Sequence, residues 1–309
     1  MSEKLPETIR PMLAYLSAPF DSPDHLYEVK WDGTRCLLFL ERGRLRLQNR
    51  RLRDITYRYP EFSHLSEVIP QDGVVLDGEI VVLKEGRPHF TSLQEREHTR
   101  SKEKIRLLSR SLPATYIVFD LLYLGYKPLL NLPLIRRREY LRKLLPQDPY
   151  LVESEYVLNR GLDFFAAVCQ RGLEGVMAKD IRSPYLPGQR SHYWLKFKPR
   201  GRRRCLIVGY IPGPKGGLRS LLVAEETEEG LRFRGRVGTG LKQEEERLLL
   251  QRLQKLPPGR PFPTVKIKDA HWVSPELSCL VSYQEITNKG RFRAPVFEGL
   301  VDETGLQTR

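Results

Sequence analysis

The sequence has little of what would place it in a secreted or metal-binding class. It has only four cysteines in 309 residues, and their spacing fits neither a disulfide framework nor a metal-ligand pair. They are Cys36, Cys169, Cys205 and Cys279. We therefore expect free thiols in a reducing compartment, and no zinc site.

Long apolar runs and targeting signals are also missing. No apolar stretch approaches the ~20 residues that cross a bilayer, and residues 1–10 do not form the apolar core of a signal peptide. There is no internal repeat and no low-complexity segment. We expect a soluble, cytoplasmic protein that has no membrane partner.

Negative charge is in deficit along the whole chain. Residues 1–200 carry 33 basic and 25 acidic side chains (+8), residues 201–309 carry 19 and 13 (+6), and the sum is +14. An excess spread in this way favours a polyanion contacted by the whole molecule. A generally basic, arginine-rich proteome would give the same charge without such a partner.

Length and patterning predict an α+β protein with two domains, residues 1–200 and 201–309. The boundary is placed at the Pro-Gly-Arg-rich segment 199–204. In the first domain we expect a lead-in loop at 6–25 and apolar strands at 26–40, 73–83 and 116–123. We also expect helices at 133–145 and 162–171, and one charged helical excursion at 90–111. The second domain has short strands, including 265–268, 271–273 and 280–287, and a helix at 242–254. This count fits a small Greek-key barrel of the OB type, which commonly grips nucleic acid.

The segment Glu28–Arg35, with the sequence EVKWDGTR, places Lys30 between apolar and aromatic neighbours at the end of a predicted strand. A lysine there is costly unless it is paired or used, because burial favours the neutral amine, which is a nucleophile. A salt bridge between Lys30 and Asp32 in a surface hairpin would explain the same residues.

Charged residues interrupt other apolar strands. Asp77 and Glu79 lie inside the run 73–83, and buried carboxylates need partners or a metal. Lys196 and Lys198 alternate with apolar residues, so they share one strand face and repel each other unless an anion lies between them. A surface bulge and a lysine-protected edge strand are the plainer explanations.

In this order, these segments resemble the motifs of the covalent nucleotidyltransferases, which include ATP-dependent DNA ligases, RNA ligases and mRNA capping enzymes. The first motif, Lys-x-Asp-Gly-x-Arg, begins at Lys30, and Asp-Gly-Glu, Glu-Gly-hydrophobic-x-x-Lys and the paired lysines follow. The segments Gly235–Gly240 and Arg293–Gly299 resemble the C-terminal domain of bacterial end-joining ligase D. The likeness covers nearly the whole chain.

The resemblance implies that Lys30 attacks the α-phosphorus of ATP and carries AMP as a phosphoramide. It further implies catalytic roles for Asp32, Arg35 and Arg293, nucleotide contacts from Glu28, Arg35, Glu79, Phe119, Lys179, Lys196 and Lys198, and Mg²⁺ or Mn²⁺ ligands in Asp32, Glu79 and Glu174. Phe119 would stack on adenine, although an aromatic in an apolar strand is often plain core. Lys179 would pair with a phosphate or a carboxylate.

The resemblance also implies that nicked double-stranded DNA is the substrate. Arg50 aligns with the family arginine that meets the 5′-phosphate, but Asn49 and Arg51-Leu52 depart from the family pattern, so the assignment could slip by one position. We expect DNA contacts from Arg50, Arg51, Arg202 and Arg203; a solvated charged turn is the plainer explanation of the first pair. No further module is recognised, so we expect a monomeric repair ligase at the bacterial nucleoid, with Ku and a repair polymerase as partners in trans.

Four rival functions are compatible with part of the pattern. A capping guanylyltransferase shares the lysine motif, but the Arg-Val-Gly-Thr-Gly segment favours a ligase. An RNA ligase is expected to have a different C-terminal domain. An NAD-dependent ligase is disfavoured because this sequence lacks a zinc-type cysteine cluster. A non-catalytic OB-containing protein would explain the charge but not Lys30, Glu79 and Glu174 together.

Overall fold

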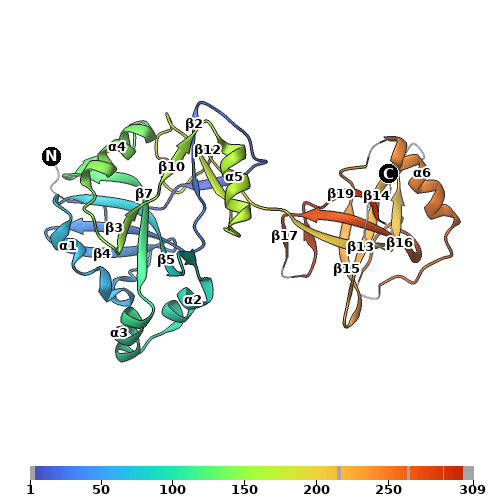
Figure 1. Ribbon diagram of the computed structural model, residues 1–309, viewed down its shortest axis with the longest axis horizontal. Helices are drawn as coiled ribbons and strands as arrows, with labels where there is room; N and C mark the ends of the chain where they lie inside the picture. Colours follow the sequence, from blue (N-terminus) through green and yellow to red (C-terminus); the bar gives the residue numbers. More distant parts are fainter. Residues whose placement is uncertain (1–3, 214–216, 242, 263–264, 288, 302–309) are drawn as a thin grey trace. The chain divides into compact units, whose positions relative to one another are not determined.

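The computed structural model describes residues 4–213, 217–241, 243–262, 265–287 and 289–301 (Figure 1). The chain divides into two compact units, Met1–Lys198 and Pro199–Arg309. The break therefore falls between residues 198 and 199, and the sequence analysis put it between residues 200 and 201. The α+β class is confirmed, because both units are built on largely antiparallel sheets with few helices.

The larger sheet of the first unit has the order β4-β3-β5-β7-β8, with β6 paired to β5 and β9 to β7. Its strands are β3 (Thr34–Glu41), β4 (Arg44–Asn49), β5 (Val74–Lys84), β6 (Arg87–Pro88), β7 (Ala114–Leu124), β8 (Lys127–Pro128) and β9 (Leu151–Glu153). The long strands β3, β5 and β7 are near-continuous apolar runs because both of their faces are covered.

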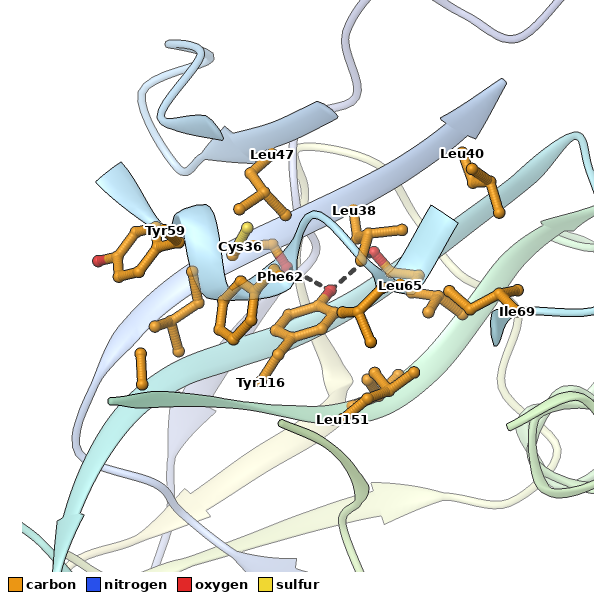
Figure 2. Packing of buried hydrophobic residues seen from close by; sticks show 14 of the residues in the cluster. Cys36, Leu38, Leu40, Leu47, Tyr59, Phe62, Leu65, Ile69, Tyr116 and Leu151 are labelled. Atoms are coloured by element: carbon orange, nitrogen blue, oxygen red, sulfur yellow. Dashed lines mark hydrogen bonds between the residues drawn. The ribbon is translucent and has the colours of Figure 1, made fainter. Parts of the chain in front are cut away.

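One face of this sheet carries the main core. Leu38 and Leu76 pack there with Phe62, and the hydroxyl of Tyr116 donates hydrogen bonds of 2.9 Å to the Cys36 carbonyl and 3.1 Å to the Leu76 carbonyl (Figure 2). The elements of the chain between β4 and β9 include η1 (Thr56–Arg58), η2 (Pro60–Phe62), α1 (Leu65–Val68), α2 (Phe90–His98), α3 (Lys102–Ser111) and α4 (Leu134–Leu144). The opposite face turns its alternate residues toward a second core.

The predicted helical excursion 90–111 is wrong as a single helix. Thr99 is extended and ends α2, and the Ser101 hydroxyl accepts a hydrogen bond from the Lys104 backbone to begin α3. Helices α2 and α3 lie together at one end of the first unit (Figure 1).

The smaller sheet of the first unit has the order β1-β12-β11-β2-β10. Its strands are β1 (Leu13–Leu16), β2 (His25–Val29), β10 (Tyr156–Leu158), β11 (Val176–Asp180) and β12 (Arg190–Phe197). Its outer face packs against α5 (Gly161–Gln170). The expected lead-in loop 6–25 therefore needs correction, since β1 pairs in parallel with β12.

The second unit is a five-stranded curled sheet in the order β15-β14-β13-β16-β19, which is consistent with the OB fold. Its elements are β13 (Gly201–Pro212), β14 (Leu218–Thr227), β15 (Gly230–Val237), α6 (Gln243–Lys255), β16 (His271–Tyr283), β17 (Glu285–Ile286), β18 (Phe292–Arg293) and β19 (Val296–Val301). Helix α6 lies against β14.

Two strand boundaries predicted for this unit are wrong. Residues 265–268 form no strand, and the strands expected at 271–273 and 280–287 belong mainly to the single strand β16. The gap between the two predicted strands, which includes Pro275, is a bulge: Leu277 pairs with Ile207, and Trp272 already pairs with Gly209. Proline has no amide hydrogen to donate, so a bulge can hold it inside a long strand. No helix of the described residues is long and apolar enough to cross a membrane.

Candidate active site

Strand alternation builds one wall of the site. Glu28, Met177 and Lys196 stand in register across β2, β11 and β12, while their neighbours Tyr27 and Val176 face α5. Because side chains alternate across a strand, Glu28, Met177 and Lys196 turn toward the larger sheet. Lys30 lies one residue beyond β2 and Lys198 one residue beyond β12, so they follow Glu28 and Lys196 by two residues and continue the same face.

The larger sheet supplies the opposite wall. Arg35 pairs in register with Glu79 across β3 and β5, and Phe119 extends from β7. A cavity of about 1160 Å³ lies between the two walls. Its lining includes Glu28, Lys30, Arg35, Glu79, Phe119, Lys179 and Lys196, all of which the sequence analysis had singled out.

Lys30 lies directly after β2, where its backbone N–H donates to the Gly175 carbonyl over 2.9 Å. Its Nζ is 2.5 Å from Glu174 Oε2, and the other carboxylate oxygen, Oε1, is 2.8 Å from Lys198 Nζ. Lys30 and Glu174 are each 22% exposed, so the amine is held but accessible. The hairpin alternative is wrong, since the close partner of Lys30 is Glu174, although Asp32 also feels its charge.

Cations gather at this end of the cavity. Burial lowers the pKa of Lys196, and the charges of Lys198, Lys30 and Arg190 lower it further. Cations that depress one another's pKa are stabilised by an anion placed among them. The shared strand face predicted for Lys196 and Lys198 agrees with this coupling, although β12 ends at Phe197.

Arg35 is locked in place from behind. Its guanidinium forms two 2.6 Å hydrogen bonds with the carboxylate of Asp77, which also accepts one of 2.7 Å from the Tyr185 hydroxyl. Burial opposes the charge of Arg35, but Asp77 raises its pKa above the ordinary value. Asp77 is fully buried, so its function is to orient Arg35.

Phe119 makes contacts other than the predicted stacking on a base. Its ring lies 4.6 Å from the Arg35 guanidinium carbon and 4.0 Å from Lys179 Nζ, and it meets Trp194 edge-on. The residue is only 7% exposed, so little of its ring surface is open to a stacked base. Phe119 nevertheless contributes to the cavity wall.

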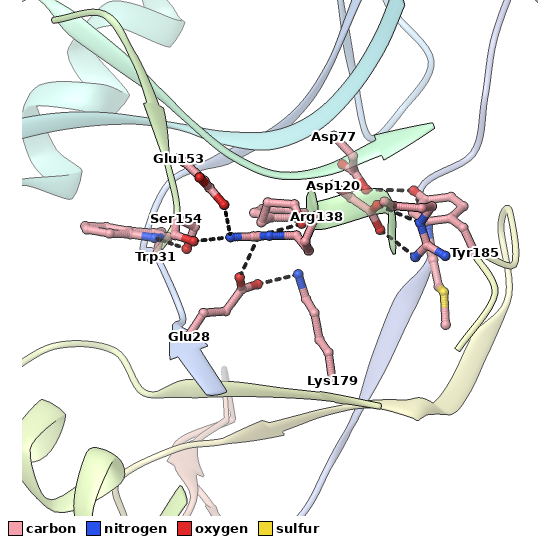
Figure 3. A network of polar contacts seen from close by, with 12 residues as sticks. Glu28, Trp31, Asp77, Asp120, Arg138, Glu153, Ser154, Lys179 and Tyr185 are labelled. Atoms are coloured by element: carbon pink, nitrogen blue, oxygen red, sulfur yellow. Dashed lines mark hydrogen bonds and ion pairs between the residues drawn. The ribbon is translucent and has the colours of Figure 1, made fainter. Parts of the chain in front are cut away.

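A buried network of charges holds Glu28 (Figure 3). The carboxylate of Glu28 pairs with Lys179 and lies 3.2 Å from Arg138 Nη1, and all three side chains are 1% exposed. Arg138 also donates to the Phe119 carbonyl over 2.8 Å, and to Glu153 over 3.1 Å. Burial lowers the pKa of Lys179, whereas the charge of Glu28 raises it. A phosphate or a carboxylate was predicted as the partner of Lys179, and in the structure the partner is the carboxylate of Glu28.

The sequence analysis missed Arg138 as a site residue, although a signal was present. Arg138 follows Leu134 by four residues and precedes Leu141 by three, which places it on the apolar stripe of α4. Tyr185, which holds Asp77, lies in a loop and gave no signal.

Carboxylates adjoin the lysine. Burial raises the pKa of Glu79 to about 8, with Asp77 and Glu174 contributing, although part of the side chain is open to the cavity. Burial and the charge of Glu174 likewise raise the pKa of Asp32. Within the described residues, no three His, Cys, Asp or Glu side chains are grouped as metal ligands. Mg²⁺ usually takes one or two carboxylates together with substrate phosphates, so these residues fit such an ion.

The predicted DNA contacts lie in two places. Arg50 and Arg51 are exposed in the turn after β4 and line the far end of the cavity. Arg202 and Arg203 are exposed on β13 of the second unit, where they pair with Glu298 at 2.9 Å and Glu225 at 3.2 Å. Arg293 is exposed on β18, also in the second unit.

Comparisons with known proteins find matches for both units of the chain. Residues 11–198 match the family model for the ATP dependent DNA ligase domain, and residues 214–304 match the model for the ATP dependent DNA ligase C terminal region. The multifunctional non-homologous end joining protein LigD of Mycolicibacterium smegmatis is 34% identical over 306 residues, which cover 96% of this chain and 38% of that protein. The chain thus spans well under half the length of this relative.

Solved structures give the same result. The ligase domain of M. tuberculosis LigD is 33% identical and has a TM-score of 0.59, covering 98% of this chain and 99% of that one. A mycobacterial DNA ligase D complexed with ATP and MES is also 33% identical, with a TM-score of 0.56 and 96% of both chains covered. The chain belongs to the ATP-dependent DNA ligase family.

Proposed function

We propose that the chain seals nicks between a 5′-phosphate and a 3′-hydroxyl in double-stranded DNA, using ATP and a covalent lysyl-AMP on Lys30. The observation that carries this proposal is the position of Lys30, whose accessible Nζ lies 2.5 Å from Glu174 in a cavity lined with cations. A lysine that only stabilised the fold would have no need of Lys196 and Lys198 at the same place.

The first step joins Lys30 to the nucleotide. The amine loses a proton and forms a phosphorus–nitrogen bond with the α-phosphorus, while the bond to the β-phosphate oxygen breaks and pyrophosphate leaves. Glu174 orients the amine, and Lys196 and Lys198 stabilise the phosphate charge. Displacement at phosphorus depends mainly on positioning and charge stabilisation, and both are properties of this cavity. Glu28, Phe119 and Lys179 form the nucleoside end.

The later steps transfer AMP to DNA. The 5′-phosphate oxygen of a nick attacks the phosphorus of lysyl-AMP, the phosphorus–nitrogen bond breaks, and Lys30 takes up a proton as it leaves, which gives a DNA-adenylate. The 3′-hydroxyl then loses its proton and attacks the 5′-phosphorus, and AMP leaves. Asp32, Glu79 and Glu174 would hold Mg²⁺ or Mn²⁺, which supplies charge stabilisation at phosphoryl oxygens. The raised pKa values of Asp32 and Glu79 support this assignment, since crowded carboxylates are stabilised by a cation.

The second unit is assigned to DNA and to the leaving group. Arg202 and Arg203 contact the DNA backbone together with Arg50 and Arg51, and Arg293 orients pyrophosphate. The relatives named for non-homologous end joining suggest a role in double-strand break repair at the bacterial nucleoid. A monomer that cooperates with Ku and a repair polymerase is the corresponding assembly. Ku should stimulate the joining of double-strand ends, and a ligation assay in which added Ku has no effect would count against that partner.

The test is covalent labelling. The chain is first treated with pyrophosphate to remove any bound AMP, and then incubated with ATP labelled at the α-phosphate and with Mg²⁺ or Mn²⁺. A labelled band on a denaturing gel is expected for the wild type and is expected to be lost on adding nicked DNA. Lys30→Ala should give no band. Lys127→Ala, an exposed lysine on β8 outside the cavity lining, is the matched control and should label normally.

Other outcomes of labelling would contradict the proposal. A band formed with labelled GTP but not with ATP would make the chain a capping-type enzyme. Labelling of Lys30→Ala to the wild-type level would remove Lys30 as the nucleophile. The absence of any band from either nucleotide would end the enzymatic assignment.

A further inference from the structure

We propose that Tyr57 is a stacking platform for the base of the nucleotide that carries the 5′-phosphate. This inference rests on the proposed DNA-sealing function and extends it to a residue outside the sequence motifs. Its basis is the far end of the cavity, where a rigid arginine-rich turn and one exposed aromatic ring lie together.

The cavity is larger than one nucleotide needs. Pockets for single small ligands span about 300–1,000 Å³, and this one measures about 1160 Å³. In the larger sheet, β5 and β3 separate β7, which carries Phe119, from β4, and the segment after β4 carries Arg50 and Tyr57. Phe119, with Lys179 Nζ 4.0 Å from its ring, therefore lines a different part of the cavity from Arg50 and Tyr57. The second part also includes Asn49, Arg51, Arg53, Asp54, Arg58, Glu97, His98 and Arg100, so five arginines face two carboxylates there and the net charge is positive. A cavity with these two parts suits a nucleotide and an additional polyanionic strand end.

The turn that forms the second part is preorganised. Asn49 Oδ1 accepts hydrogen bonds from the backbone of Arg51 at 2.9 Å and Arg53 at 3.0 Å. Leu52 adopts a positive φ of 62°, which an L-residue accepts only when its surroundings hold it. At the end of the turn, Asp54 Oδ1 accepts from both the amide and the hydroxyl of Thr56. The arginines therefore extend from a fixed frame, which reduces the entropy lost on binding.

Tyr57 follows this frame directly and is 57% exposed, the second largest value among the large hydrophobic side chains that the structure describes. Arg58 holds the ring edge, since its Nε donates to the Tyr57 hydroxyl over 3.0 Å. Arg58 is tied to α2 in turn, because its carbonyl accepts from the buried guanidinium of Arg96 over 2.8 Å. A pair with Glu61 at 2.7 Å fixes Arg96 itself. The fixed orientation of a solvent-exposed aromatic ring is not explained by packing against the core.

Cations and an exposed aromatic ring together match the chemistry of a nucleic-acid end. Guanidinium groups suit phosphate oxygens, and an aromatic face suits any base without regard to sequence. Arg50 and its neighbours would hold the 5′-phosphate, and Tyr57 would hold the base attached to the same sugar.

The experiment measures the DNA-dependent step alone. Pre-adenylated protein is mixed with nicked duplex in a single turnover, and the DNA concentration that gives half the maximal rate is determined. Stacking on an aromatic side chain is worth about 5- to 150-fold in affinity. Tyr57→Ala should raise the half-saturating concentration by that factor, while Tyr57→Phe should remain within about threefold of the wild type. Labelling of Lys30 by ATP, which needs no DNA, should be unaffected in both variants.

Two controls make the result decisive. Tyr140 lies on α4 outside the cavity lining; it is 36% exposed, and the guanidinium carbon of Arg136 is 6.0 Å from its ring centroid. Tyr140→Ala should therefore leave nick sealing unchanged. A nick whose 5′-phosphate nucleotide lacks its base should weaken wild-type binding but not weaken Tyr57→Ala further. Equal losses for both proteins on the abasic substrate, or sealing by Tyr57→Ala at the wild-type level, would overturn the inference. A wild type that never labels Lys30 would instead refute the proposed function.

Discussion

Replacing Arg138 by methionine should destabilise the first unit far more than replacing Arg142, one helical turn later. Both arginines extend from α4 and contact the same carboxylate, Glu153, but they differ in burial. Arg138 is 1% exposed, whereas Arg142 is 64% exposed. Methionine keeps much of the side-chain volume, so the comparison isolates charge and hydrogen bonding.

The magnitude follows from the groups that Arg138 would leave behind. The carboxylate of Glu28 would keep Lys179 but lose one of its two cationic partners, and the carbonyls of Phe119 and Ser154 would each lose a donor. Breaking a buried ion pair from one side costs about 3–5 kcal/mol. The loss of an exposed pair such as Arg142–Glu153 costs about 0–1 kcal/mol.

Thermal unfolding tests this difference. In a unit of 198 residues, each kcal/mol shifts the midpoint by about 2–4 °C, so Arg138→Met should lower the transition of the first unit by about 6–20 °C. Arg142→Met should lower it by at most about 4 °C. The two units can unfold separately, so the transition is assigned by whether ATP raises it. Equal shifts for the two variants would refute the argument that burial makes Arg138 the stabilising partner.

Three more substitutions test individual contacts. Burial raises the pKa of Glu79 from 4.5 to about 8, so between these pH values the folded state keeps a proton that the unfolded state loses. Without nucleotide or metal, the stabilisation is therefore full below pH ~4.5, and the free energy of unfolding falls by up to about 1.4 kcal/mol per pH unit until pH ~8. Glu79→Gln should flatten this slope in urea titrations. Gly175→Ala should cost at least about 1–3 kcal/mol of stability and slow Lys30 labelling. The reason is that Gly175 has a φ of 148° and that a Cβ there would meet the Phe197 carbonyl oxygen at 2.0 Å. Normal labelling of that variant would show that Lys30 does not depend on this backbone. Arg35→Lys should cost about 1.5–3 kcal/mol, since lysine offers no fork for the two bonds to Asp77, and an unchanged unfolding midpoint would contradict the role given to that pair.

Local patterns were sufficient to predict much of the fold. The apolar runs that became β3, β5 and β7 were found because both faces of these strands are buried, so nearly every residue signals the same element. Alternation also placed Lys196 and Lys198 on one face. Prediction was wrong where pairing outweighed composition: 271–273 and 280–287 were expected as separate strands, but β13 holds residues 271–283 in the single strand β16.

The site was harder to predict because its partners lie far apart in the chain. Glu174 is 144 residues from Lys30, and no local pattern pairs them. Arg138 is 110 residues from Glu28. The resemblance brought Lys30 and Glu174 into one site, but as a nucleophile and a metal ligand, and it left out the contact between them. It gave no indication of Arg138, which has no motif and was taken for one residue of an amphipathic helix.

Burial divides the charged residues of the first unit into two groups with different functions. Lys30, Glu174 and Lys198, which would contact ligand, are 22–32% exposed, so water can screen them until a ligand arrives. The residues that hold the walls are almost fully buried; these are Asp77, Asp120, Arg137 and Arg138. A buried charge with fixed partners costs much to disturb, whereas an exposed charge is easily repositioned. Substitutions in the first group should therefore impair labelling at nearly unchanged stability, and those in the second should lower stability first, so the order in which the two properties fail distinguishes these two groups.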